Sequence, residues 1–155
     1  MARTPSTMLA LGTASPAFRL PDVDGRMHSL EDFAAQPALL VAFICSHCPF
    51  VRHLRREFAA FAREYAPRGL AVVAINSNDI VAYPQDGPDA MRAEATELGY
   101  VFPYLLDESQ AVAKAYQAAC TPDFFLFDAS RRLVYRGQFA DSRPGTARPV
   151  TGAAF

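Results

Sequence analysis

Residues 38–49 have the sequence ALLVAFICSHCP, and they decide the fold that we predict for this chain. Ala38–Ile44 is an unbroken apolar run, which is typical of a strand buried on both faces. Over Val51–Tyr65, apolar side chains recur at steps of three and four with arginines between them, which predicts an amphipathic helix. Cys45 and Cys48 therefore lie at the junction between a buried strand and a helix.

The rest of the chain alternates between short apolar runs and helical patterns. We expect a flexible arm at residues 1–15, followed by a single domain over residues 16–155. Besides the strand and helix above, the elements expected in that domain are a hairpin of Ala17–Leu20 and Met27–Ser29, a helical turn at Leu30–Ala34, strands at Leu70–Ile75 and Pro103–Leu106, helices at Asp89–Leu98 and Ser109–Ala118, and a hairpin of Phe124–Phe127 and Leu133–Tyr135. This alternation predicts an α/β fold with a central mixed sheet flanked by helices.

The composition excludes several classes of protein. The formal net charge of the 155 residues is −1, so the chain lacks the basic excess that is typical of nucleic-acid binding. It contains no run of about 18 apolar residues to span a membrane, and its first residues are too weakly apolar for a secretory signal. Three cysteines are too few for a disulfide framework. We therefore expect a cytoplasmic protein that binds neither nucleic acid nor membrane.

The cysteine pair has the spacing of a redox dithiol. A helix N-terminus carries free N–H groups and a partial positive charge, and both favour a thiolate. Because Cys45 lies at the mouth of the helix and Cys48 one turn on, Cys45 is the expected nucleophile and Cys48 the resolving thiol. A protonated His47 would stabilise the thiolate and make the disulfide more oxidising. The alternative for His47 is a plain exposed loop residue.

A second motif, Cys120-Thr121-Pro122, directly precedes the expected strand Phe124–Phe127. A proline that enters a strand lacks a backbone donor and often marks a special geometry. A cis Thr121–Pro122 bond is one such geometry. Cys120 is either a further redox thiol or a buried core residue.

Together, the two motifs resemble those of the thioredoxin superfamily. The leading hairpin and the strand and helix inserted between the motifs resemble its redoxin branch, which includes AhpC/TSA-like and TlpA/ResA-like proteins. More narrowly, the chain is similar to bacterial thioredoxin-like proteins with a CxHCP motif over three stretches: Cys45–His53, Ala74–Asp79 with Tyr83-Pro84, and Ala119–Tyr135 continuing into Arg136-Gly137-Gln138.

The resemblance implies a thiol–disulfide oxidoreductase that needs no cofactor. By analogy with the family, Thr121 and Pro122 bind the backbone of the partner, which is a protein or a small molecule bearing a disulfide or thiol. Asp79 falls where TlpA/ResA-like proteins carry a glutamate, so it is a candidate proton acceptor for Cys48, and the alternative is a turn aspartate. The buried aspartate of thioredoxin falls here at about Leu39.

Two other functions remain open at this stage. The chain lacks the PxxxTxxC motif of peroxiredoxins before Cys45, so a thiol peroxidase would have to act outside that motif. Alternatively, Cys45 and Cys48 with His47 or His53 offer two sulfurs and imidazole nitrogen, which suit copper or zinc. We expect no bound metal.

The family continues into a last helix, and Thr151–Phe155 looks like its beginning. A sheet face without that helix would be an association risk. We therefore expect either a truncated chain or another copy of the chain covering this face, as in a homo-oligomer.

Overall fold

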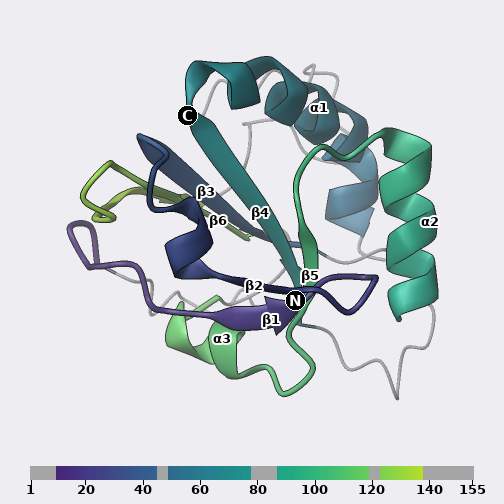
Figure 1. Ribbon diagram of the computed structural model, residues 1–155, viewed down its shortest axis with the longest axis horizontal. Helices are drawn as coiled ribbons and strands as arrows, with labels where there is room; N and C mark the ends of the chain where they lie inside the picture. Colours follow the sequence, from purple (N-terminus) through teal and green to yellow (C-terminus); the bar gives the residue numbers. More distant parts are fainter. Residues whose placement is uncertain (1–9, 45–48, 78–86, 119–122, 138–155) are drawn as a thin grey trace.

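The structure is a computed structural model, and it describes residues 10–44, 49–77, 87–118 and 123–137. Within these residues, one five-stranded sheet has the strand order β5-β4-β3-β6-β7 (Figure 1). The first three strands of that order run parallel to one another, and β6 and β7 run antiparallel to their neighbours, which confirms the predicted mixed sheet. The strands are β3 (Ala38–Phe43), β4 (Leu70–Asn76), β5 (Tyr104–Leu106), β6 (Asp123–Phe127) and β7 (Leu133–Gly137).

Helices cover both faces of the sheet, as predicted (Figure 1). The first apolar core includes α1 (Pro49–Tyr65) and α2 (Pro88–Leu98), and the second includes α3 (Ala111–Ala115) with the hairpin of β1 (Arg19–Pro21) and β2 (Met27–Ser29). Two short 3-10 turns, η1 (Leu30–Phe33) and η2 (Ala66–Arg68), complete the described elements. Among these helices, none combines the length and apolar character required to cross a bilayer.

Strand β3 is the centre of the fold because it packs into both cores. Leu40 and Ala42 belong to the core on the α1 side, whereas Leu39, Val41 and Phe43 belong to the core on the α3 side. All are at most 1% exposed. This two-sided burial explains the unbroken apolar run in the sequence. Each large apolar side chain buried in this way stabilises the fold by about 1.5–3 kcal/mol.

The strand registers bring four chain positions to one edge of the sheet. Phe43 is the Cα partner of Ile75 in β4, and Ile75 is the partner of Leu105 in β5. On the other side of β3, Phe43 pairs with Asp123, the first residue of β6. We call this edge, formed by Phe43, Ile75, Leu105 and Asp123, the carboxyl edge, because the three parallel strands end there.

Helix α3 is shorter than the predicted Ser109–Ala118. Gln110, the residue before it, has φ 65°, and Gln117, after it, has φ 56°. Both angles lie in the left-handed region, which cannot continue a right-handed helix. The apolar pattern extends further than the helix because Tyr116, the C-cap of α3, and Ala118 still pack in the core on the α3 side.

The last residues of the expected N-terminal arm pair with β7 and the turn before it. The N–H of Gly12 donates to the carbonyl of Leu133 at 2.7 Å, and the N–H of Leu133 donates to the carbonyl of Thr13 at 2.9 Å. The N–H of Ser15 donates to the carbonyl of Arg131 at 2.8 Å. Residues 12–15 therefore lie along the beginning of β7.

Candidate functional site

The residues that the sequence nominated for the redox site all fall outside the described residues, whereas His53, an alternative metal ligand, lies in α1. Cys45, His47 and Cys48 are in the stretch 45–48, Asp79 is in 78–86, and Cys120, Thr121 and Pro122 are in 119–122. Their roles stay predictions. The structure describes the strands and helices to which these stretches connect in sequence.

All three stretches connect in sequence to the carboxyl edge. Ile44, the residue before Cys45, is fully buried, and its N–H donates to the carbonyl of Ile75 at 3.0 Å. Ser77 follows β4 immediately before the second stretch, and Asp123 opens β6 immediately after the third. The register therefore brings together the neighbours of residues that lie more than 70 positions apart in the sequence.

The stretch 45–48 is followed directly by α1. This helix starts at Pro49, where a proline is favoured because the first N–H of a helix has no intrahelical acceptor. The predicted strand and helix on either side of the cysteine pair are therefore both present. At position 39, where thioredoxin has its buried aspartate, Leu39 is fully buried in the apolar core.

A buried polar cluster at the carboxyl edge was not predicted. Asp107 follows β5 directly and is only 1% exposed. Its Oδ2 accepts two hydrogen bonds, from the hydroxyl of Ser77 at 2.8 Å and from the N–H of Ala113 at 2.9 Å. Its Oδ1 is buried and accepts no hydrogen bond in the described part of the chain. A polar residue at the carboxyl end of a strand was the available sequence signal, because ligands of open α/β sheets bind near such ends.

Hydrogen bonds to backbone carbonyls connect further residues to the same cluster. The N–H of Asp107 donates to the carbonyl of the fully buried Asn76 at 2.8 Å. The side-chain amide of Gln110 donates to the carbonyl of Ser77 at 2.8 Å, and the N–H of Gln110 donates to the carbonyl of Asp107 at 3.0 Å. These bonds hold Gln110 in its left-handed conformation, which is unfavourable for a residue other than glycine.

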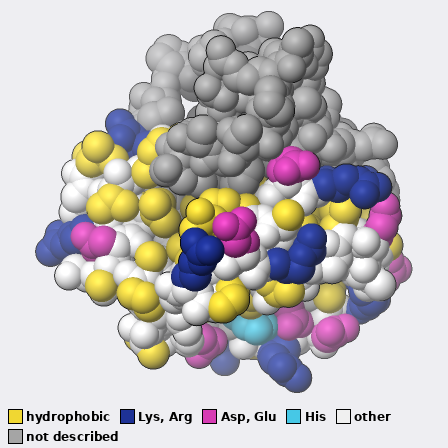
Figure 2. Space-filling model, turned by 90° about the horizontal axis from the view of Figure 1, so that it is seen from above, with side chains coloured by type: hydrophobic (Ala, Val, Ile, Leu, Met, Phe, Trp, Pro, Cys, Tyr) yellow, Lys and Arg dark blue, Asp and Glu magenta, His cyan; other side chains and the backbone are white. Residues whose placement is uncertain are grey.

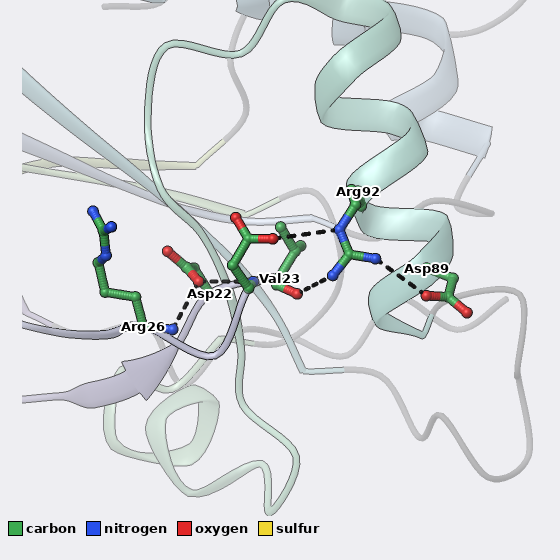
Figure 3. Close-up of polar contacts among 6 residues, drawn as sticks. Asp22, Val23, Arg26, Asp89 and Arg92 are labelled. Atoms are coloured by element: carbon green, nitrogen blue, oxygen red, sulfur yellow. Dashed lines mark hydrogen bonds and ion pairs between the residues drawn. The ribbon is translucent and has the colours of Figure 1, made fainter.

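Arg92, in the second turn of α2, holds this helix against the N-terminal hairpin (Figure 3). Its guanidinium donates to the carbonyl of Val23 at 2.5 Å and lies 3.5 Å from Asp24 Oδ1. It also donates to Asp89 Oδ1 in its own helix at 3.3 Å. The stretch 78–86, which carries Asp79, is therefore preceded by Ser77, which is hydrogen-bonded to Asp107, and followed by α2, in which Arg92 is hydrogen-bonded to the hairpin.

Asp22 organises the turn of that hairpin. Its Oδ1 accepts the N–H groups of Asp24 and Arg26 at 2.9 and 3.0 Å, and its Oδ2 lies 2.8 Å from His28 Nε2. Burial by itself would raise the pKa of Asp22, but the hydrogen bonds from His28 and the two backbone groups outweigh burial and lower this pKa.

Glu94 is a second unpredicted buried carboxyl group, only 4% exposed on α2. It accepts a short hydrogen bond from the hydroxyl of Tyr100 and a longer one from Tyr104 at 3.5 Å. Burial and the neighbouring Glu94 raise the pKa of Tyr100 far above its usual value. Tyr100 stacks on Phe102 in the core on the α1 side, so this cluster belongs to the packing of α2.

An apolar hollow of about 310 Å³ lies at the opposite edge of the sheet from the cluster at Asp107. Its lining includes Ala38 and Leu70, the first residues of β3 and β4.

The described residues contain no group of three or more histidine, cysteine, aspartate or glutamate side chains fit to hold a metal. The face in Figure 2 mixes side chains of both charges with hydrophobic ones over its described part.

The sequence profile of the AhpC/TSA family matches residues 11–136. The chain belongs to the AhpC/TSA family. The prediction of a redoxin in the thioredoxin superfamily is therefore confirmed. This redoxin is 26% identical over 132 residues to the thiol-disulfide oxidoreductase ResA of Geobacillus thermodenitrificans, covering 84% of this chain and 70% of ResA. It is 28% identical over 115 residues to a putative peroxiredoxin of Mycobacterium tuberculosis, covering 74% of this chain and 68% of that protein.

Two solved structures are similar to this redoxin over nearly its whole length. A hypothetical protein of Sinorhizobium meliloti 1021 is 56% identical with a TM-score of 0.94, covering 97% of this chain and 82% of that chain. A protein of Geobacillus kaustophilus is 53% identical with a TM-score of 0.92, covering 96% and 79%. The thioredoxin domain of a Bacteroides vulgatus thiol-disulfide oxidoreductase, 19% identical with a TM-score of 0.69 over 87% and 90%, shares the fold. The named relatives support a thioredoxin-like redox function for the redoxin.

Proposed function

We propose that this redoxin is a thiol–disulfide oxidoreductase whose dithiol is Cys45 and Cys48. The observation that carries the proposal is the chain path around the pair. The fully buried Ile44 ends the strand side, hydrogen-bonded to Ile75, and α1 begins at Pro49. A dithiol spaced by two residues and followed by a helix N-terminus is favoured as a thiolate.

The reaction proceeds by two exchanges. The Cys45 thiolate attacks one sulfur of a substrate disulfide, forms a mixed disulfide and expels the other substrate sulfur as a thiolate, which takes up a proton. Cys48 then loses its proton and attacks the sulfur of Cys45, which releases the second substrate thiolate. The substrate gains two electrons and the protein becomes the Cys45–Cys48 disulfide. A dithiol donor restores it by the reverse exchange.

The other nominated residues have supporting roles in this proposal. His47 stabilises the thiolate of Cys45, Thr121 and Pro122 orient the partner backbone, and Asp79 accepts the proton of Cys48. Asp79→Asn should slow the second exchange and leave the first unchanged, as single-turnover kinetics would resolve. Equal rates for both exchanges in Asp79→Asn and the unaltered protein would remove Asp79 from the mechanism.

We further propose that the partners are proteins or small molecules with a disulfide or thiol, that the protein acts in the cytoplasm, and that it forms a homo-oligomer. Sedimentation would detect the homo-oligomer, and fractionation of cells would locate the protein. A monomer at micromolar concentration, or recovery outside the cytoplasm, would contradict the respective proposal.

The redox equilibrium of the cysteine pair tests the main proposal. Metal-free protein is equilibrated in graded thiol/disulfide buffers and its free thiols are trapped. The number of trapped thiols is then determined from the mass of the protein. We expect a two-electron transition between roughly −270 and −120 mV, which is the range of catalytic dithiols. Cys120→Ser should keep this transition, while Cys45→Ser and Cys48→Ser should each abolish it. If no intramolecular disulfide forms, or one equivalent of copper or zinc prevents it, the metal-binding function replaces this one.

A thiol peroxidase is the second candidate, favoured by the AhpC/TSA family and by the similarity to a putative peroxiredoxin. Here the Cys45 thiolate attacks a peroxide oxygen, becomes a sulfenic acid and releases an alcohol or water. Cys48 then condenses with the sulfenic acid to form the disulfide and water. Stopped-flow oxidation by hydrogen peroxide distinguishes the two functions: a rate far above that of a free thiol supports the peroxidase, and an ordinary thiol rate supports the oxidoreductase.

A further inference from the structure

The carboxylate of Asp107 is buried at the carboxyl edge without a positive partner. It is 1% exposed, and among the described residues it forms no ion pair with any arginine, lysine or histidine. Two donors, the hydroxyl of Ser77 and the N–H of Ala113, converge on its Oδ2. Oδ1 has no hydrogen-bonded neighbour at all in this part of the chain.

The register sets how far this charge lies from the end of β3. Phe43, Ile75 and Leu105 form one row across three parallel strands, and Asp107 lies two residues beyond Leu105. The chain leaves β3 at Ile44, and Cys45 is the next residue in the sequence. Strands β5 and β3 are two strand spacings apart in the sheet, a distance of about 10 Å.

We propose that Asp107 is a buried negative charge that lowers the reduction potential of the Cys45–Cys48 dithiol and so favours its use as a reductant. This inference rests on the proposed function. A negative charge at this edge opposes formation of a nearby thiolate, and a dithiol whose thiolate is less stable is a weaker oxidant. At an effective dielectric constant of about 20, a unit charge roughly 10 Å away changes such an equilibrium by about tenfold.

Asp107 has a competing, purely structural role, because it caps Ala113 and holds Ser77. Asp107→Asn and Ser77→Ala separate the two roles. Asp107→Asn keeps an oxygen to accept both hydrogen bonds and removes the charge. Ser77→Ala removes one hydrogen bond and keeps the charge. Asp128→Asn is the matched control, because Asp128 holds the N–H groups of Ser130 and Arg132 at the opposite edge of the sheet.

The experiment measures the equilibrium of each full-length variant with glutathione, by counting trapped thiols. We expect Asp107→Asn to shift the equilibrium constant about tenfold towards a more oxidising protein, which is about 30 mV for a two-electron couple. Ser77→Ala and Asp128→Asn should leave the constant within twofold. An unchanged constant in Asp107→Asn overturns the proposal, and so does an equal shift in Ser77→Ala.

Two further measurements keep the proposal decidable. If Asp107→Asn does not fold, Gln110→Lys introduces a cation on the exposed residue beside Ser77, and it should shift the constant at least twofold in the same direction. If the unaltered protein forms no disulfide, the proposed function fails, but the reactivity of the reduced thiols still depends on the charge of Asp107. Their alkylation below neutral pH should then be about tenfold faster in Asp107→Asn, and an unchanged alkylation rate overturns the role of Asp107.

Discussion

The hydroxyl of Ser77 donates a 2.8 Å hydrogen bond to Oδ2 of Asp107, and this contact joins the carboxyl ends of β4 and β5. The two residues are 30 positions apart in the sequence. Ser77 is also the last described residue before the stretch that carries Asp79. The contact therefore holds Ser77, the residue that immediately precedes a stretch nominated for catalysis.

Truncation of Asp107 should destabilise the fold. In Asp107→Ala the hydroxyl of Ser77 and the N–H of Ala113 both lose their acceptor in a buried site. We expect a loss of about 3 kcal/mol in the free energy of unfolding, against about 1 kcal/mol for Asp107→Asn, which keeps an acceptor oxygen. Urea denaturation followed by circular dichroism measures both values. Similar losses in the two variants would contradict this account of the hydrogen bonds.

Gly69, which ends η2, should not tolerate a side chain. Its φ is 99°, and a Cβ added there would lie 2.6 Å from Cγ of Pro37. Gly69→Ala should therefore cost about 3 kcal/mol, combining backbone strain with the clash. Gly25→Ala is the matched control, because Gly25 has φ 84° and nothing within 4 Å of the added Cβ. It should cost about 1 kcal/mol in the same urea measurement. Equal costs would mean that Pro37 moves aside.

The Asp22–His28 contact should make stability depend on acid pH. The pKa of Asp22 is lowered in the folded protein, so its contribution is present above the unfolded value of 3.8 and is lost as the pH falls through the folded pKa. We expect Asp22→Asn to flatten the fall in melting temperature below about pH 4. Asp89→Asn, a change at a fully exposed carboxylate, should leave the fall unchanged. An identical pH profile for Asp22→Asn and the unaltered protein would exclude this contribution.

His47 should tune the cysteine pair if it is protonated beside the thiolate. His47→Ala should then raise the pKa of the Cys45 thiol and lower the reduction potential, by about 30 mV for a tenfold change in the equilibrium constant. Thiol titration by ultraviolet absorbance and the glutathione equilibrium measure the two effects. His28→Ala, on β2, removes a histidine from the N-terminal hairpin and serves as the control. A thiol titration unaffected by His47→Ala would leave His47 as an exposed loop residue.

The sequence by itself determined the elements whose signal is local. The apolar run at Ala38–Ile44 and the helical periodicity of Val51–Tyr65 each require only neighbouring residues to be recognised, and both elements are present. The position of the cysteine pair between them follows from the sequence alone. The family motifs also gave the redoxin resemblance that the AhpC/TSA profile confirms.

Only the tertiary structure decided which distant residues meet. Strand register places Asp123 beside Phe43 and Asp107 beside Ser77, and register depends on packing of the whole sheet rather than on any local pattern. The late start of α3 depends on Gln110 and its bond to Ser77, again across the chain. A buried polar group needs a partner, and that partner need not be near in the sequence. This is why the sequence offered only the position of Asp107 at the end of a strand, and its partners became known only with the fold.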